Sequence, residues 1–326
     1  DPSWFGLRGR SEDLEKYSAK IGALFNDPDR PLMNRAIAGA FPPGSIFKLI
    51  SSLAGLETAS VSKNDYYTDT GVVKLGTYEF RNWYFLKYGT GEGKINVVRA
   101  IARSTDTFYY DLGGKMGPEP MAFWARKAGM GKKNGIDLTG EVDGLIPDPE
   151  WKLNVKKEKW YLGNTYHMAI GQGDVLATPL QLATMTGIFV NDGKLCVPYL
   201  LKGKEYKCTA LEMSKSNLEV VVDGMIGACS PGGTAGVFYN QPYQVACKTG
   251  TAEYGPRKQN GSRDTHAWFT MAGPMIEKNG VWILDNTNNK AITITVFVEG
   301  GGEGSTVAAP VAKKLMDWWM DIEKKD

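Results

Sequence analysis

The sequence predicts an α+β fold in which helices dominate the middle of the chain and strands dominate its last third. Apolar residues recur with helical spacing in several segments between residues 45 and 230, whereas from Tyr243 onward they alternate with the period of a strand. No internal repeat and no linker rich in Pro, Gly or Ser divides the 326 residues. We therefore expect one domain whose terminal helices cover a sheet formed late in the chain.

In the first third, Ser11 and the acidic residues after it predict a helix from Glu12 to Leu24. Turn residues follow at 26–31. A second helix begins at Gly44-Ser45 and is apolar nearly all round, which predicts that it is buried. Residues 64–95 are aromatic and glycine-rich, and we expect a long connection with short strands there.

In the middle of the chain, helical spacing predicts helices at 96–102, 121–128, 179–190 and 212–228. The first of them breaks at residues 103–106, and the apolar run 107–112 after the break ends at a glycine turn. Residues 137–149 are rich in Gly, Asp and Pro and are expected to form a loop.

Late in the chain, strands are predicted at 244–252, 267–272 and 291–298, and residues 281–284 could extend the second. A last helix places apolar residues on one stripe, the face expected to pack inward. These residues are Ala308, Val311, Leu315, Trp318, Trp319 and Ile322.

Composition narrows the class of protein. A net charge of +2 with no basic run argues against a partner nucleic acid. No apolar segment approaches the ~20 residues that span a bilayer. Only His167 and His266 could assist the cysteines, which show no C-x-x-C spacing, so we expect no metal and no cofactor.

The chain has four cysteines, and their spacing leaves their oxidation state open. They are Cys196, Cys208, Cys229 and Cys247. Cys196 and Cys208 could pair, but the interpretation we favour is buried free thiols, because free cysteine is among the most buried residue types.

Ser45 and Lys48 form an S-x-x-K motif at the start of the buried helix. Residues three apart on a helix share a face, about 5–6 Å apart at Cβ, so the lysine can take the proton of the serine hydroxyl. A serine becomes a nucleophile only with such a base. A second S-x-x-K, residues 60–63, lies in a polar stretch with no buried helix behind it, so the motif is weak until partners are found.

Two further stretches supply candidate partners. Lys248-Thr249-Gly250-Thr251 lies on the first late strand, where a lysine beside a hydroxyl suits a carboxylate and the glycine leaves room for a substrate. Ser104-Thr105-Asp106 places a hydroxyl and a carboxylate at an interhelical break. By its letters, Ser62-Lys63-Asn64 competes with this second stretch. Taken singly, these stretches also fit an ordinary loop or a solvated lysine before a turn.

Three motifs follow one another along the chain: S-x-x-K at a buried helix start, S-x-D at an interhelical break and K-T-G on a late strand. This ordered set resembles the penicilloyl serine transferases, the superfamily of penicillin-binding proteins and serine β-lactamases. Flanking segments are similar to class B penicillin-binding proteins and extend the match over nearly the whole chain. They are residues 26–36, 41–45, 169–173, 178–181 and 266–269. Asp106, where most relatives have asparagine, resembles the elongation-specific branch, penicillin-binding protein 2, as do residues 135–138, 146–147 and 151–152.

The resemblance implies a penicilloyl serine transferase fold. It places an all-helical subdomain mainly at 45–230 and an antiparallel-sheet subdomain mainly at 1–44 and 231–326. It also implies a peptidoglycan D,D-transpeptidase that cross-links stem peptides ending in D-Ala-D-Ala during cell-wall elongation and is acylated by β-lactam antibiotics.

By resemblance, Ser45 is the nucleophile, Lys48 is its base and Ser104 relays a proton to the leaving amine. Asp106 is expected to hold Lys48 and the substrate amide. Lys48 must be neutral to act as a base, and we expect burial and the charge of Lys248 to lower its pKa from the usual ~10.4.

The third stretch is expected to bind substrate. By resemblance, Lys248 and Thr249 hold the terminal carboxylate beside Gly250. The backbone N–H groups of Ser45 and Thr251 would form the oxyanion hole, where one donor contributes about 10²–10³ in rate.

The family has a cytoplasmic tail, a membrane helix and an N-terminal pedestal domain, none of which is found in this sequence. We interpret the chain as a soluble fragment of a protein anchored at the outer, periplasmic face of the cytoplasmic membrane. The implied partners are a membrane glycan polymerase and scaffold proteins of the elongation machinery. Some members carry a zinc site built with Cys and His between the first two motifs; residues 49–103 contain neither, so we expect no zinc.

Three alternatives stay open. A serine β-lactamase would release the acyl group to water, but no E-x-x-x-N segment occurs at class A spacing and the aromatic segment 67–88 fits poorly. A D,D-carboxypeptidase would hydrolyse the same acyl-enzyme. A β-lactam sensor domain would acylate once and signal, and it would need a receptor remainder that this chain does not contain.

Overall fold

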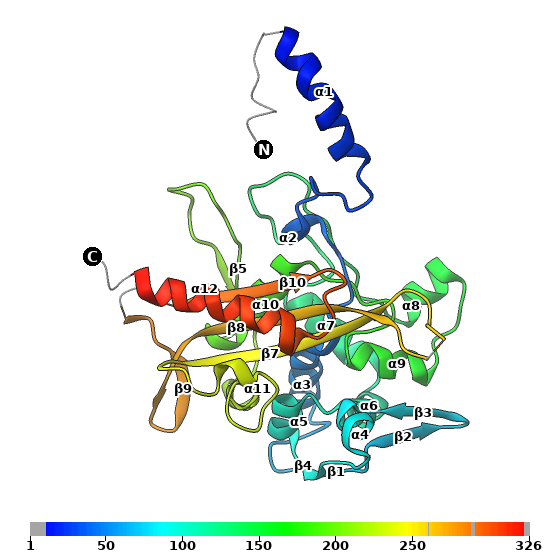
Figure 1. Ribbon diagram of the computed structural model, residues 1–326. Coiled ribbons are helices and arrows are strands. Elements are labelled where there is room, and N and C mark those ends of the chain that lie inside the picture. The colour runs from blue at the N-terminus through cyan, green and yellow to red at the C-terminus, as the bar shows by residue number, and fades with distance from the viewer. Residues whose placement is uncertain (1–10, 260, 288–290, 323–326) are drawn as a thin grey trace.

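The fold is α+β, as predicted, and its sheet is formed by the last third of the chain. The computed structural model describes residues 11–259, 261–287 and 291–322. Strands β7 (Gln244–Tyr254), β8 (Asp264–Lys278) and β10 (Ile292–Val298) form an antiparallel sheet in the order β10-β8-β7, and β9 (Val281–Leu284) pairs with the end of β8. Figure 1 shows this sheet between the C-terminal helix and the helical half.

Alternate residues of the sheet face two different cores. Phe269 of β8 packs with α12 (Ala309–Ile322), whereas the neighbouring Thr270 hydroxyl meets Thr186 of α10 (Pro179–Val190), with an Oγ1–Oγ1 distance of 2.7 Å. The strand period of 2 therefore places the sheet between α12 on one face and the helical half on the other.

The helix α12 packs with a different face from the predicted one. Its buried residues are small or flexible: Ala309, Ala312 and Met316. Val311, Leu315 and Trp318 are 43%, 45% and 60% exposed, so the prediction that this stripe packs inward was wrong for these three residues, whereas Ala308 is buried as expected. Small residues let the helix backbone approach the sheet closely, which the count of large apolar residues does not capture. The side chain of Ile322 lies outside the described part.

The helical half surrounds α3 (Lys48–Glu57), whose residues from Lys48 to Leu56 are all buried, as its sequence predicts. The helices around it are α5 (Val97–Arg103), α6 (Asp106–Met116), α7 (Pro118–Lys127), α9 (Leu162–Ala169), α10 and α11 (Lys215–Ala228). The helix α6 continues through the expected glycine turn. Gly113 instead serves packing, since a Cβ there would lie 3.0 Å from Ala169 Cβ in α9.

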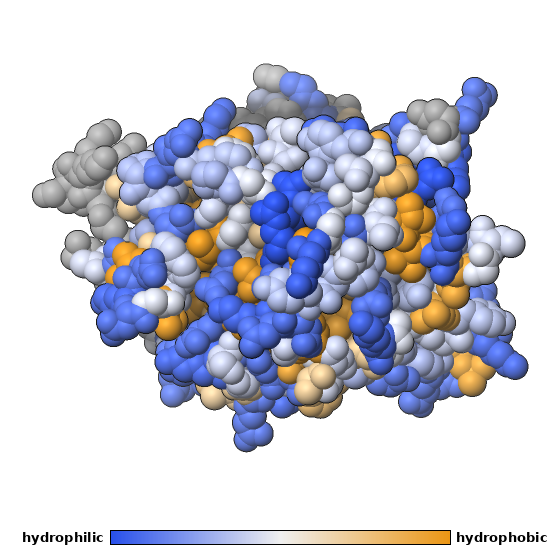
Figure 2. Space-filling view, turned by 90° about the horizontal axis from the view of Figure 1, so that it is seen from below, coloured by the Kyte–Doolittle hydropathy of each residue, from blue (hydrophilic) through white to orange (hydrophobic). Residues whose placement is uncertain are grey.

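Short elements connect these helices and frame the site. They are α1 (Ser11–Asn26), α2 (Arg35–Ala38), β1 (Tyr67–Asp69), β2 (Val72–Leu75), β3 (Tyr78–Arg81), α4 (Trp83–Tyr88), β4 (Gly93–Ile95), α8 (Pro149–Trp151), β5 (Lys194–Cys196), β6 (Cys208–Ala210), 3₁₀ turns at Gly44–Phe47 and Gly236–Phe238, and π-helical turns at Lys152–Lys156 and Gly304–Ala308. The face seen from below is mostly hydrophilic, with apolar residues in separate groups (Figure 2).

Most of the expected elements occur, and a few were missed. The helix at 12–24 is α1, and residues 64–95 do contain short strands, although α4 within them was not predicted. The helices α8 and α9 were also missed, because no strong period marks residues 149–169. Residues 281–284 form their own strand rather than an extension of β8. The division into two subdomains at residues 44/45 and 230/231 stays a prediction.

The cysteines are paired, which corrects the expectation of free thiols. Disulfides join Cys196 to Cys208 and Cys229 to Cys247, and the described residues include no free cysteine. Cys196 and Cys208 oppose each other across the β5–β6 hairpin, and Cys247 on β7 reaches the residue after α11. Both pairings depend on strand register and helix packing, which the spacing of the cysteines does not reveal.

We predict that Gly224→Ala destabilises the protein. A Cβ at Gly224 in α11 would lie 2.6 Å from Ile101 Cβ in α5, the helix that leads to Ser104. Overpacking of this kind costs about 1–3 kcal/mol. Chemical denaturation measures it, with Gly163→Ala in α9 as the control, since a Cβ there meets nothing within 4 Å. Equal stability of the two variants would contradict the close packing of α5 on α11.

Candidate active site

Ser45 and Lys48 lie where a 3₁₀ turn becomes a buried helix. Ser45 is half-buried in the turn Gly44–Phe47, and Lys48 begins α3 with its side chain wholly buried. The turn rather than an α-helix therefore carries Ser45, which is one local difference from the predicted helix start. Gly44 has φ +55°, and a Cβ on it would lie 2.6 Å from the Thr251 carbonyl oxygen. Glycine thus allows the turn to press against β7.

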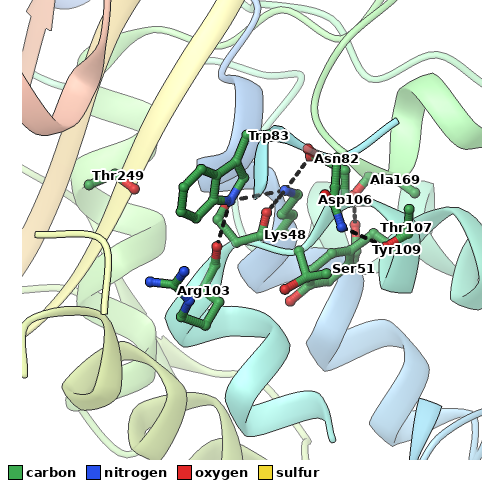
Figure 3. Close-up of polar contacts among 12 residues, drawn as sticks. Lys48, Ser51, Asn82, Trp83, Arg103, Asp106, Thr107, Tyr109, Ala169 and Thr249 are labelled. Atoms are coloured by element: carbon green, nitrogen blue, oxygen red, sulfur yellow. Dashed lines mark hydrogen bonds and ion pairs between the residues drawn. The ribbon is translucent and has the colours of Figure 1, made fainter. Parts of the chain in front are cut away.

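The Lys48 ammonium binds the second motif. Its Nζ donates to the Ser104 carbonyl oxygen at 2.8 Å, to Ser104 Oγ at 3.1 Å and to Asp106 Oδ1 at 2.5 Å. The Tyr109 ring lies 5.2 Å from Nζ. Figure 3 shows Lys48 pointing into this polar cluster, with Trp83 and Asn82 beside it. The first two predicted motifs are therefore joined directly, although 56 residues separate them.

Ser104 reaches Lys48 through an unusual backbone conformation. It ends α5 in the left-handed region, with φ 57° and ψ 42°, and α6 begins two residues later at Asp106. A left-handed conformation costs a non-glycine residue about 1–3 kcal/mol and persists only when its surroundings enforce it. The predicted interhelical break is thus a sharp reversal that turns both the carbonyl and the hydroxyl of Ser104 toward Lys48.

The third motif lies on β7, against the Ser45 turn. Lys248 is wholly buried, and its Nζ donates to the Thr249 carbonyl oxygen at 3.0 Å. A Cβ on Gly250 would lie 3.0 Å from both Ile46 Cγ1 and the Pro43 carbonyl oxygen, so the strand touches the turn. Thr249 Oγ1 donates to Thr234 Oγ1 at 2.9 Å, and Thr251 Oγ1 accepts from the Gly304 N–H at 3.3 Å.

Burial lowers the pKa of both lysines. Desolvation lowers the pKa of Lys48, while the charge and hydrogen bond of Asp106 oppose that shift. Desolvation, followed by repulsion from Lys48, lowers the pKa of Lys248 well below its usual range. Burial therefore lowers the pKa of Lys48, as expected. The expected contribution of Lys248 to that shift stays a prediction, while repulsion between the two lysines disfavours the state in which both are charged.

The competing motifs lie elsewhere. Ser60 Oγ contacts Thr58 Oγ1 at 3.0 Å, and Lys63 is 54% exposed in an ion pair with Asp223. Residues 62–64 lie in the same loop, on the edge of a shallow groove next to α11. Neither stretch contributes a contact to the Lys48 cluster.

Sequence reasoning missed several residues around the site. Trp83 Nε1 donates to the Arg103 carbonyl oxygen at 2.9 Å, and the Arg103 guanidinium lies 4.9 Å from the Trp83 ring. Thr234 supplies the acceptor for Thr249. No periodicity or motif marks these positions, and Trp83 lies in the segment that was interpreted only as a connection. No cluster of three or more His, Cys, Asp or Glu side chains suited to a metal occurs in the described ranges.

The chain belongs to the penicillin-binding protein family. The profile of the penicillin binding protein transpeptidase domain matches residues 11–317. The site geometry agrees with this assignment, since buried Lys48, three residues after Ser45, binds Ser104 and Asp106, and β7 with buried Lys248 packs against the Ser45 turn.

Within the family, the chain is similar to the MrdA, or penicillin-binding protein 2, group. It is 34% identical over 318 residues to the peptidoglycan D,D-transpeptidase MrdA of Acinetobacter baumannii, covering 93% of this chain and 46% of the relative. MrdA of Escherichia coli K12 is 32% identical, with 92% and 48% covered. The chain thus spans about half the length of these curated relatives.

Solved structures give the same result. A complex between penicillin-binding protein 2 and MreC from Helicobacter pylori aligns with a TM-score of 0.81 at 30% identity, over 93% of this chain and 54% of that one. Penicillin-binding protein 2 of Pseudomonas aeruginosa in complex with WCK 5153 aligns with a TM-score of 0.75 at 34% identity, over 92% and 66%.

We predict that Asp106→Asn shifts the pH dependence of acylation toward acid. Asp106 favours the charged form of Lys48, so its loss lowers the pKa of Lys48 further and makes the neutral base available at lower pH. The rate of acylation by a chromogenic β-lactam, measured from pH 5 to 10, should show its rising limb at lower pH.

The matched control is Asp111→Asn, one turn further along α6, where the carboxylate pairs with Lys115 at the surface. In this variant, the rising limb of the acylation rate should lie at the same pH as in the wild type. An unmoved limb in Asp106→Asn would show that Asp106 does not set the charge of Lys48.

Proposed function

We propose that this chain is the catalytic domain of a peptidoglycan D,D-transpeptidase that acts through a Ser45 acyl-enzyme. The observation that carries the proposal is the Lys48 ammonium, wholly buried one turn after Ser45 and held by Ser104 and Asp106. Membership of the penicillin-binding protein family and similarity to MrdA proteins support it.

In the acylation step, neutral Lys48 takes the Ser45 proton and Ser45 Oγ attacks the carbonyl between the last two D-alanines of a stem peptide. The C–N bond breaks as Ser104 gives its hydroxyl proton to the leaving D-alanine amine and takes up the proton that Lys48 received, so that Lys48 is neutral again. A placed base contributes typically 10²–10⁴-fold to such a step. Asp106 keeps Lys48 oriented and offers its second oxygen to the substrate amide.

The β7 edge binds the substrate. Lys248 and Thr249 hold the terminal carboxylate, and the peptide lies along the strand beside Gly250, whose missing side chain lets β7 pack against the Ser45 turn. The contact between Gly44 and the Thr251 carbonyl places the backbone of Thr251 beside that of Ser45. Their N–H groups receive the developing oxyanion, each donor contributing about 10²–10³ in rate.

In the second step, an amine from a neighbouring stem peptide attacks the acyl-enzyme and forms the cross-link, which regenerates the Ser45 hydroxyl. A β-lactam enters the same first step, and its ring carbonyl takes the place of the peptide carbonyl.

We place this activity in cell-wall elongation at the outer face of the cytoplasmic membrane, as part of an anchored protein. The similarity to MrdA proteins supports this setting. Related structures include penicillin-binding protein 2 with MreC and a peptidoglycan synthase complex that couples polymerization to crosslinking. A scaffold protein and a glycan polymerase are therefore the proposed partners. Within the described residues, no helix is long and apolar enough to cross a membrane.

We predict that Ser45→Ala abolishes covalent labelling by a fluorescent penicillin, because no other hydroxyl lies one turn before the buried base. Ser60→Ala is the matched control, since it alters the second S-x-x-K in a surface loop. Gel fluorescence after denaturation is the measurement. Label that persists in Ser45→Ala would refute the proposed nucleophile.

The lifetime of the acyl-enzyme separates this proposal from its alternatives. Intact-mass analysis after penicillin treatment should show a stoichiometric adduct that lasts for minutes or longer, because a transpeptidase transfers its acyl group efficiently to an amine and only slowly to water. Turnover of penicillin within a second would instead identify a serine β-lactamase. Rapid release of D-alanine from a stem pentapeptide without cross-linking, in the presence of an acceptor amine, would identify a carboxypeptidase.

A further inference from the structure

Ser104 contacts Lys48 through two atoms, so the position of its backbone matters as much as its hydroxyl. Its carbonyl and its Oγ lie 2.8 Å and 3.1 Å from Lys48 Nζ. Its left-handed conformation is not intrinsically favoured for serine. Residues on either side must therefore hold the reversal in place.

The buried carboxylate of Glu92 binds the residues on both sides of Ser104. The Glu92 side chain is only 5% exposed, and each of its oxygens binds a neighbour of Ser104. Oε1 accepts from Arg103 Nε at 2.5 Å, and Oε2 accepts from Thr105 Oγ1 at 2.6 Å. Charge-assisted hydrogen bonds of this length are strong and directional.

Glu92 is itself anchored to the same region. Its backbone N–H donates to Asp69 Oδ2 at 2.8 Å, and Asp69 is 2% exposed. The other oxygen of Asp69 accepts from Thr107 Oγ1 at 2.6 Å, in the first turn of α6. Asn82 Nδ2 also donates to both oxygens of Asp69. The segment before the second motif is therefore tied to Asp69, which also holds the residue after Asp106.

Arg103 also connects this region to the third motif through hydrogen bonds. Its Nη1 donates to the carbonyl oxygens of Gly232 and Gly233, at 3.1 Å and 3.3 Å. The next residue of that loop, Thr234, accepts the hydrogen bond from Thr249 on β7. Glu92, Arg103 and this loop thus connect the reversal at Ser104 with the strand that carries Lys248.

We propose that Glu92 is a positioning residue of the reaction, which clamps Arg103 and Thr105 and so holds Ser104 against Lys48. This inference rests on the proposed function, because the rate that it governs is acylation of Ser45. Glu92 reaches no reacting atom and acts only through its two neighbours.

The first test is Glu92→Gln, which keeps the shape of the side chain and removes its charge. The acylation rate with a fluorescent penicillin should fall at least about tenfold, since misplacement of a catalytic group by ~1 Å can cost ~10²-fold. Glu79→Gln is the matched control, because Glu79 lies on β3 and pairs with Arg81 at the surface. It should acylate at the wild-type rate.

A double-mutant cycle separates positioning from general destabilisation. If Glu92 acts through Ser104, adding Glu92→Gln to Ser104→Ala should slow acylation by clearly less than it does in the wild-type background, because the hydroxyl is already absent and only the carbonyl contact with Lys48 is left to misplace. A full tenfold effect in the Ser104→Ala background would overturn the proposal. So would a wild-type rate for the single variant.

Thr105→Val gives a second route if Glu92→Gln does not fold, because it removes one arm of the clamp at constant shape. Acylation should slow about threefold or more and should be restored by Thr105→Ser, which keeps the donor. A wild-type rate in Thr105→Val would also overturn the proposal.

Amide hydrogen exchange of residues 103–107 tests the clamp without any labelling step. Exchange should accelerate in Glu92→Gln and in Thr105→Val but not in Glu79→Gln, and unchanged exchange would overturn the clamp. Failure of wild type to label at Ser45 would instead contradict the proposed function, so the two ideas fail on different observations.

Discussion

The structure depends on burying the amines of two lysines whose pKa values are both affected by one carboxylate, that of Asp106. Lys48 and Lys248 are both wholly buried, and the charge of Asp106 acts on each of them. Burial disfavours the charged form of both lysines, whereas Asp106 favours it. Burial therefore acts in the direction that a lysine base requires, and Asp106 acts against it.

The fold serves this arrangement by bringing three distant segments into backbone contact. Gly44 and Gly250 let the Ser45 turn and β7 touch, and the Trp268 indole N–H fixes the turn by donating to the Pro42 carbonyl oxygen at 2.9 Å. The reversal at Ser104 brings the third segment against Lys48.

Much of the fold and the motif residues could be predicted from the sequence. Strand alternation located β7 and β10, and the buried character of α3 followed from its apolar circumference. The clamp around Ser104 could not be predicted, since Glu92 and Arg103 are ordinary charged residues until the chain folds. The prediction of the inward face of α12 was wrong because small alanines, rather than the larger apolar residues, pack against the sheet. The disulfides were missed because they depend on register.

The central claim is that Ser45, Lys48 and the β7 edge form one acyl-transfer centre. A crystal structure of the protein after reaction with a penicillin tests it most directly. The account predicts an ester on Ser45 Oγ, its carbonyl oxygen within about 2.7–3.1 Å of the Ser45 and Thr251 N–H groups, and the ligand carboxylate beside Lys248 and Thr249. An ester on any other residue, or a carbonyl oxygen turned away from Thr251, would contradict it.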